Sequence, residues 1–286
     1  MIFKKFKWLI LGIVLVLGGF GYVYRWDIND AWSAWSAPKL PEAHKYEPAQ
    51  ADINLNSDQN SPFEGGVATS QNYILVSSPP SSPKKIDPFE NIGSLPLEVN
   101  LEIPFTTQAP YQNWDYPYQE ACEEASAIMV DAFYKGEEGV IPIEKAKQAI
   151  DDFVAYENKA LGYYKDTNAT DLAKAVRGHF GYAEVIIKPV ISINDIKRVV
   201  ANGFPVILPA AGKLLNNPNF RNGGPLYHML VVKGYTGNKI ITNDPGTRRG
   251  ADYVYSADVL MNAIHDWNGG DVENGEKIMI VIMPNP

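Results

Sequence analysis

The sequence has 286 residues, enough for one ordinary globular domain with additional segments. Hydrophobic residues make up 45% and charged residues 20%, as in chains that bury a core. The formal net charge is −8; without the four basic residues of the first 25 positions, 21 basic and 33 acidic residues remain, a net charge of −12. A segment this acidic repels phosphates and anionic lipid head groups, which argues against nucleic-acid binding.

Residues 8–24 form an uncharged apolar run with a basic flank at 1–7 and acidic residues soon after it, at Asp27 and Asp30. A helix needs roughly 17–25 such residues to cross a bilayer, and this run just reaches that length. Because positive flanks stay inside, we expect a single-pass signal anchor in the cell membrane, with a cytoplasmic tail at 1–7 and the rest of the chain extracytoplasmic. The alternative is a signal peptide cleaved near Ala31, although bulky Trp32 makes a poor cleavage site.

Residues 25–95 are rich in Pro, Ser, Ala, Asn and Gln. Such a composition cannot bury enough apolar surface to fold alone, so it predicts an extended extracytoplasmic linker. The short apolar run Tyr73–Val76 is either part of this linker or one additional strand of the domain that follows.

Residues 96–286 are predicted to form one α+β domain. The apolar periodicity predicts helices at Cys122–Tyr134, Ile143–Tyr156, Asp171–Phe180 and Asn194–Asn202. It predicts strands at Val185–Val190, Pro205–Leu208, Tyr227–Lys233, Lys239–Thr242, Tyr253–Tyr255 and Lys277–Ile282. Helices come mostly first and strands mostly last, which indicates a helical part packed against an antiparallel sheet and argues against a doubly wound fold.

Cys122 is the single cysteine, so neither an intrachain disulfide nor a Cys-rich zinc site can form. It opens a predicted helix, where the dipole and the free N–H groups favour a thiolate. Glu123 and Glu124 follow at about 100° and 200° around the helix, so we interpret them as first-turn acids with a modest effect on the sulfur. On composition alone, an ordinary buried cysteine that packs as a small hydrophobic residue is the commoner interpretation of Cys122.

His228 lies in a strand that forms a predicted hairpin with the strand leading to Asp244. With a three-residue loop at Tyr235–Gly237, the numbers of two residues that face each other across the hairpin add up to 472. His228 then faces Asp244 directly, at a Cβ separation of about 5 Å. The carboxylate would then orient the imidazole and stabilise its charged form. With a two-residue loop the register slips by one residue and the pair is lost.

Several ordered segments together resemble a known family. These segments are Pro104–Pro110, Asn113–Asp115, Cys122–Ser126, Gly203–Ile207, the strand of His228 and Asn243–Pro245. They are similar to the C-39-like peptidase group, which has the papain-like fold and is related to the bacteriocin-processing double-glycine-leader peptidases. The resemblance implies Cys122 as nucleophile, His228 as general base and Asp244 as orienting acid. It also implies a glutamine that binds the oxyanion together with the Cys122 backbone N–H.

The chain departs from the processing peptidases at two points. It has Cys-Glu-Glu where they have Cys-Gly-Pro, and it has Tyr116 where their glutamine stands. We therefore assign the oxyanion role to Gln108, with Gln119 and Gln112 as alternatives. The transporter regions that bind ATP are also missing, so leader-peptide export is not expected.

The sequence thus predicts a membrane-anchored extracytoplasmic cysteine peptidase that hydrolyses a peptide or related amide through a Cys thioester. The alternatives are an inactive or weakly active papain-fold binding module of the cell envelope, and a non-proteolytic amidase or acyltransferase that uses the same residues. No cofactor, metal site or nucleotide-binding loop is expected.

Overall fold

The computed structural model describes residues 39–47 and 87–285. The predicted membrane anchor at 8–24 and the possible strand Tyr73–Val76 lie outside these residues. Within the two described ranges, no helix has both the length and the apolar character needed to cross a membrane. The chain divides into two compact units, Met1–Leu40 and Pro41–Pro286, and the fold below is that of the second.

The described part of the second unit contains five α-helices and seven strands. The helices are α3 (Cys122–Tyr134), α4 (Ile143–Ala160), α5 (Ala169–Phe180), α6 (Ile193–Ala201) and α7 (Ala257–Ala263). The strands are β1 (Glu98–Asn100), β2 (Val185–Pro189), β3 (Val206–Ala211), β4 (Tyr227–Thr236), β5 (Lys239–Asn243), β6 (Tyr253–Ser256) and β7 (Ile278–Ile282). Each predicted helix and strand is confirmed to within a few residues. The sequence patterns missed α7 and β1, which are too short to show a periodicity.

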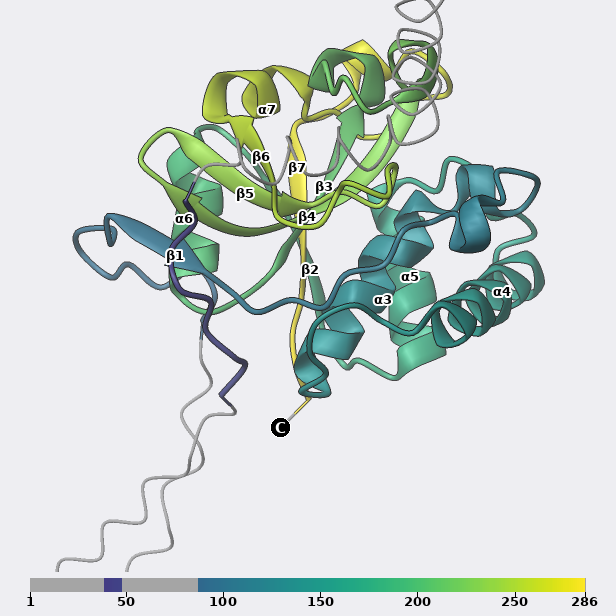
Figure 1. Cartoon of the computed structure of the whole chain (residues 1–286), viewed down its shortest axis with the longest axis horizontal. Coiled ribbons are helices and arrows are strands. Elements are labelled where there is room, and N and C mark those ends of the chain that lie inside the picture. The colour runs from purple at the N-terminus through teal and green to yellow at the C-terminus, as the bar shows by residue number, and fades with distance from the viewer. Residues whose placement is uncertain (1–38, 48–86, 286) are drawn as a thin grey trace, which may run out of the picture. The chain divides into compact units, whose positions relative to one another are not determined.

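The strands form one antiparallel sheet in the order β2-β7-β3-β4-β5-β6, with β1 paired to the end of β4. In Figure 1 the helices α3, α4 and α5 gather on one side of the sheet, while α6 lies near β1. The apolar core fills the space between these helices and the sheet. This arrangement confirms the predicted α+β class with helices packed on an antiparallel sheet.

Three of the five described α-helices, α5, α6 and α7, begin with a side-chain cap or a capping box, and α3 and α4 do not. The side chain of Asn168 accepts a hydrogen bond from Asp171 N–H at the start of α5, and Ser192 forms the predicted capping box with Asp195 at the start of α6. In contrast, α3 is preceded by Ala121, whose side chain cannot cap. The first-turn N–H groups beside Cys122 therefore receive no cap from the preceding side chain.

The segment 41–47 belongs to the compact unit, although the linker prediction of 25–95 included it. The backbone N–H of His44 donates to Asn100 O, and its carbonyl accepts from Glu102 N–H. The ring of Tyr46 packs against those of Phe133 and Tyr134 at 5.6 Å and 5.1 Å. The predicted linker therefore includes a segment that packs on the domain. The sequence did not show this, because the contacts join residues that are far apart along the chain.

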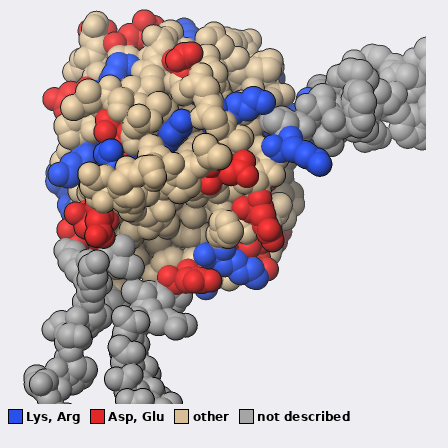
Figure 2. All heavy atoms as spheres, turned by 90° about the vertical axis from the view of Figure 1, so that its left-hand side faces the viewer, with Lys and Arg blue, Asp and Glu red and all other residues tan. Residues whose placement is uncertain are grey.

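Charge is mixed on the surface of this unit. On the side of β1 and α6, Figure 2 shows acidic and basic side chains interspersed, with no patch of a single sign. On that face the surplus of acidic residues is therefore not concentrated into one binding surface.

The hairpin of β4 and β5 differs from its predicted register. Thr236 pairs with Lys239, so the loop has two residues, Gly237 and Asn238, and paired numbers sum to 475 instead of 472. Gly237 has a φ of 55°, as the tight turns of two-residue hairpins require. The predicted loop Tyr235–Gly237 is therefore wrong. An odd sum would place His228 and Asp244 on opposite faces of the sheet.

A β-bulge at Lys233 corrects this mismatch. Between Val232 and Gly234 the register shifts by one residue, so that Val231 pairs with Asn243 and the sum becomes 474. Continued by one residue, this register sets Asp244 on the same face as His228, as a diagonal neighbour and not a directly opposed one. The carbonyl of the bulged Lys233 accepts a hydrogen bond from the N–H of Leu101, the residue that follows β1.

Candidate active site

His228 and Asp244 form a buried pair. The Nε2 atom of His228 lies 2.8 Å from Oδ1 of Asp244, and the two side chains are 1% and 0% exposed. The predicted contact is therefore present, although it arises through the bulge and not through the predicted loop. Because Nε2 faces the carboxylate, Nδ1 is the ring nitrogen left for a reacting partner.

Asp244 is held as an ionised carboxylate by several donors. Gly246 N–H donates to Oδ1 at 2.9 Å, while Tyr255 Oη and Asn217 Nδ2 donate to Oδ2 at 2.5 Å and 3.2 Å. Burial by itself raises the pKa of Asp244, but His228 and these donors outweigh it and hold the pKa below its ordinary value. The sequence analysis missed Asn217 and Tyr255, and no local pattern marks either residue.

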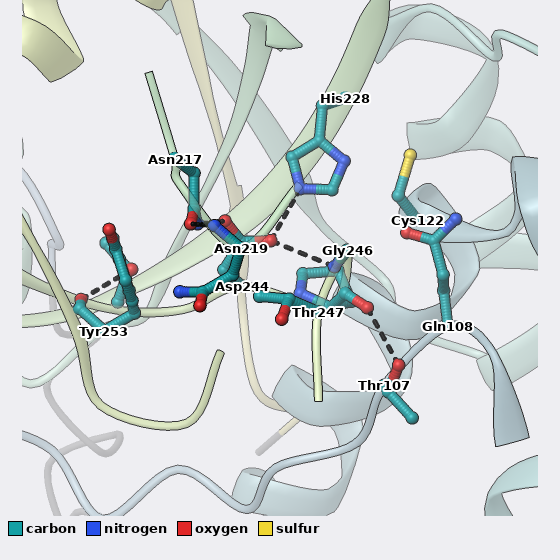
Figure 3. Close-up of polar contacts among 12 residues, drawn as sticks. Thr107, Gln108, Cys122, Asn217, Asn219, His228, Asp244, Gly246, Thr247 and Tyr253 are labelled. Carbon is teal, nitrogen blue, oxygen red and sulfur yellow. Dashed lines mark hydrogen bonds and ion pairs between the residues drawn. The ribbon is translucent and has the colours of Figure 1, made fainter. Parts of the chain in front are cut away.

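Cys122 lies on the other side of the His228 ring. Figure 3 shows its sulfur on the side of the ring turned away from Asp244, so that the three side chains follow one another in the order Cys122, His228, Asp244. The ring of Phe220 packs edge-on against His228 at 5.3 Å and limits its rotation. The backbone of Met229, the residue after His228, lowers the pKa of the Cys122 thiol by hydrogen bonding.

The thiol of Cys122 is nevertheless in an environment that disfavours the thiolate. Burial raises its pKa well above the ordinary value, and a negative charge on Glu123 raises it further. Glu123 Oε2 lies 3.0 Å from Cys122 Sγ, and the side chain is only 1% exposed. The interpretation of Glu123 as a first-turn acid with a modest effect is therefore wrong.

Glu124 is also buried, contrary to the same interpretation. Its carboxyl group faces that of Glu157 on α4, and neither carboxyl has another hydrogen-bond partner in the described structure. Burial raises the pKa of Glu157 to about 8, and it raises that of Glu124 well above its ordinary value. Each of the two carboxyl groups therefore carries a proton at neutral pH.

Gln108 lies beside Cys122 in Figure 3. Its Nε2 donates to Tyr118 O and Gln119 O, each at 3.1 Å, and its buried Oε1 has no hydrogen-bond partner. Gln108 N–H also donates to the carbonyl of Pro245, at 3.0 Å, which ties this segment to the turn after Asp244. The alternatives Gln112 and Gln119 have exposed side chains. The oxyanion role of Gln108 stays a prediction, since Nε2 is engaged with backbone carbonyls.

The backbone N–H of Cys122 is the other donor expected near the sulfur. It has no hydrogen-bond partner among the described residues, in agreement with the missing cap of α3. It is therefore available to bind a developing negative charge. Residues 39–47 and 87–285 contain no group of three or more His, Cys, Asp and Glu side chains placed to hold a metal ion.

Comparison with protein families identifies the family of this chain. Residues 100–269, more than half of the chain, match the model of the Peptidase_C39 like family. The matched range includes Cys122, His228 and Asp244. No curated protein matches the chain.

The solved structures that are similar to this chain include the following three. A Bacillus anthracis protein described as a C39-like peptidase is 15% identical, with a TM-score of 0.41, over 66% of this chain and 99% of that one. The double glycine motif protease of an AMS/PCAT transporter, solved with the leader peptide, is 20% identical, with a TM-score of 0.36, over 65% and 94%. Xylellain, a cysteine protease from Xylella fastidiosa, is 11% identical, with a TM-score of 0.29, over 68% and 88%. These scores are too low to support an argument about this chain.

Proposed function

Because the chain belongs to the Peptidase_C39 like family and is therefore a cysteine peptidase-like hydrolase, we propose that it cleaves a peptide or related amide bond with Cys122 as nucleophile. His228 acts as general base and acid, and Asp244 orients it. The observation that carries this proposal is the buried series Cys122, His228, Asp244, with the 2.8 Å contact between His228 Nε2 and Asp244 Oδ1.

The proposed reaction begins when His228 Nδ1 takes the proton of Cys122. The thiolate attacks the substrate carbonyl, and His228 then gives this proton to the departing amine, which leaves a thioester on Cys122. A water molecule, deprotonated by His228, hydrolyses the thioester. Asp244 remains ionised throughout and stabilises the imidazolium, as its several hydrogen-bond donors and lowered pKa favour.

The oxyanion of each tetrahedral intermediate would be bound by the Cys122 N–H, which has no other described partner. Gln108 is the proposed second donor. To serve in this way, its Nε2 group has to release one of the two carbonyls of Tyr118 and Gln119 when the substrate binds.

The location of the reaction is part of the proposal. The apolar run 8–24 and its basic flank favour a chain anchored in the cell membrane with the hydrolase domain outside. The substrate would then be an extracytoplasmic peptide or amide.

Iodoacetamide labelling of the full chain tests the nucleophile and its base. We expect alkylation at Cys122, with a labelling rate that falls in His228→Ala because the base is lost. His44→Ala is the matched control, since the side chain of His44 is exposed and only its backbone is bonded. Equal labelling of wild type and His228→Ala at every pH would overturn the proposed pair.

One observation favours a second candidate, a binding module with the same fold. The Cys122 thiol is buried, and its pKa is raised well above the ordinary value, which is the opposite of a typical reactive cysteine. The same labelling experiment separates the two functions, because a binding module would leave Cys122 unlabelled in the folded wild-type chain.

A further inference from the structure

Glu123 contacts the proposed nucleophile although it is the next residue along the helix. Successive side chains of a helix point about 100° apart, so this contact is not expected from α3 alone. It forms because Glu123 Oε1 accepts a hydrogen bond from Thr167 N–H at 3.1 Å, in the loop between α4 and α5. That bond turns Oε2 back to the sulfur of Cys122, at 3.0 Å.

The described ionisable groups that surround Glu123 are acids, the Cys122 thiol and a tyrosine. The ionisable groups that act on it or respond to it are Cys122 and Glu124 on α3, Glu157 on α4, Asp166 before α5, and Tyr227 on β4. In the described ranges, Glu123 forms no ion pair with Lys, Arg or His, and a buried unpaired carboxylate costs several kcal/mol. A neutral carboxylic acid avoids this cost.

The two oxygens of Glu123 then have distinct roles. Oε1 accepts the N–H of Thr167, so it is the carbonyl oxygen of the acid. Oε2 accepts a hydrogen bond from the Cys122 thiol, its one described partner, and in a protonated Glu123 it is the oxygen that carries the proton. The O–H group therefore points at the sulfur.

We propose that Glu123 is protonated in the active enzyme and donates an O–H hydrogen bond to Cys122 Sγ, which positions and stabilises the thiolate. This inference rests on the proposed role of Cys122 as nucleophile. Glu123 is a positioning residue: it keeps its own proton, while the proton of Cys122 goes to His228 Nδ1. Donation to an ionised sulfur is the stronger, charge-assisted kind of hydrogen bond.

The same contact makes the nucleophile sensitive to alkaline pH. Burial, and then the neighbouring Glu124, raise the pKa of Glu123 well above its ordinary value. When Glu123 finally ionises, its carboxylate faces the sulfur at 3.0 Å and disfavours a second negative charge there. As Glu123 loses its proton, the sulfur therefore takes its own proton back from the His228 imidazolium.

The test measures the iodoacetamide labelling rate of Cys122 against pH in the full chain. In wild type the rate should pass through a maximum and fall as Glu123 ionises. Glu123→Gln keeps a neutral donor to the sulfur and an acceptor for Thr167 N–H, so it should stay within about threefold of wild type at neutral pH, a change of under about 1 kcal/mol, and lose the alkaline fall. Glu123→Leu removes both groups and should slow labelling roughly tenfold to hundredfold.

Glu120→Gln is the matched control, because its carboxyl bonds to Gln119 Nε2 and not to the sulfur; it should keep the alkaline fall. Faster labelling of Glu123→Gln than of wild type at neutral pH, with a lower apparent thiol pKa, would show an ionised Glu123 and overturn the proposal.

An infrared difference spectrum decides the protonation of Glu123 without any reaction. At neutral pH, wild type minus Glu123→Gln should show the C=O band of a protonated carboxylic acid, and Glu120→Gln should not remove it. A difference that shows carboxylate bands in place of this acid band overturns the proposal, even if Glu123→Leu fails to fold. Labelling that is independent of His228 overturns the proposed function instead, and the acid band still tells whether Glu123 carries its proton.

Discussion

Two buried carboxyl groups touch the proposed catalytic side chains, and they have opposite surroundings. Asp244, at the turn after β5, receives hydrogen bonds from Tyr255, Asn217 and Gly246 N–H in addition to its contact with His228. Glu123, in the first turn of α3, receives one N–H bond, from Thr167. The pKa of Asp244 is lowered and that of Glu123 is raised, although both are almost completely buried. Donors and charges nearby, and not burial, therefore decide which carboxyl ionises.

Glu124 and Glu157 extend this comparison, since their carboxyl groups face each other without any other hydrogen-bond partner in the described structure. The four carboxyl groups therefore differ in their hydrogen-bond donors. Asp244 has several donors and Glu123 has one N–H donor, whereas Glu124 and Glu157 have none apart from each other. The ionised group is placed where a cationic imidazole forms, and the neutral groups lie on the side of the sulfur. This distribution suits a site in which a proton moves from Cys122 to His228.

Removing the Asp244 carboxylate should have the largest effect on the labelling rate of Cys122. Asp244→Ala leaves His228 without its orienting acceptor and should slow Cys122 labelling by up to roughly 10⁴-fold, as when an orienting carboxylate is lost in a triad. Asp244→Asn keeps an acceptor oxygen and should lose less. Both variants need a thermal melt to show that they fold. If Cys122 in the folded Asp244→Ala variant is labelled as fast as in wild type, another group orients His228. The contrast between an ionised Asp244 and a protonated Glu123 then has no bearing on the site.

The substitution Glu157→Gln tests the Glu124–Glu157 pair through the free energy of unfolding. The folded protein holds a proton at Glu157 up to pH about 8, whereas the unfolded chain releases it near 4.5. The folded state thus binds more protons between these values, so its stability falls as pH rises through that window. Glu157→Gln should flatten this slope and stabilise the protein at pH 8 by on the order of 2–4 kcal/mol.

Denaturant unfolding at several pH values measures this effect. Glu144→Gln is the matched control on the same helix, because Glu144 is exposed in the first turn of α4. An unchanged pH slope in Glu157→Gln would mean that the carboxyl pair ionises freely, and that the absence of donors does not keep it neutral.

Tyr255→Phe should have a smaller effect on the site, because it removes one donor of several from Asp244. The pKa of a carboxylate rises when a donor is lost, so the acid limb of Cys122 labelling should move to higher pH. Asp244 has a depressed folded pKa, so the stability it contributes is present above its unfolded pKa and is lost as pH falls through the folded value. That loss should begin at higher pH in Tyr255→Phe.

The expected cost of Tyr255→Phe at neutral pH is about 1.5–3 kcal/mol, the range for a hydrogen bond to a charged group. Tyr253→Phe is the matched control, since Tyr253 lies on the same strand and its hydroxyl makes no hydrogen bond to Asp244. Identical acid limbs in the two variants would show that Asn217, Gly246 and His228 suffice to keep Asp244 ionised.

The sequence patterns predicted the helix and the strand that carry the site residues better than they predicted the strand register that brings those residues together. Helix α3 begins at Cys122 as expected, and His228 lies in the expected strand, because both follow from local periodicity. The contact of His228 with Asp244 was also expected, but from a wrong loop. The bulge at Lys233 that restores the contact has one local sign, Gly234 inside the strand, which the sequence analysis did not use. It depends on β1, since Val99 O would lie 2.3 Å from a Cβ atom at position 234, a position that therefore requires glycine.

By itself, then, the sequence determined the α+β class, the order of the elements and the residue types that can carry cysteine chemistry, because these depend on neighbours a few positions apart. Only the tertiary structure decided the ionisation of the carboxyl groups. Glu123 meets Thr167 across 44 positions, and Asn217 meets Asp244 across 27. A pKa depends on the groups that surround a side chain in space, and folding brings those groups together from distant parts of the chain.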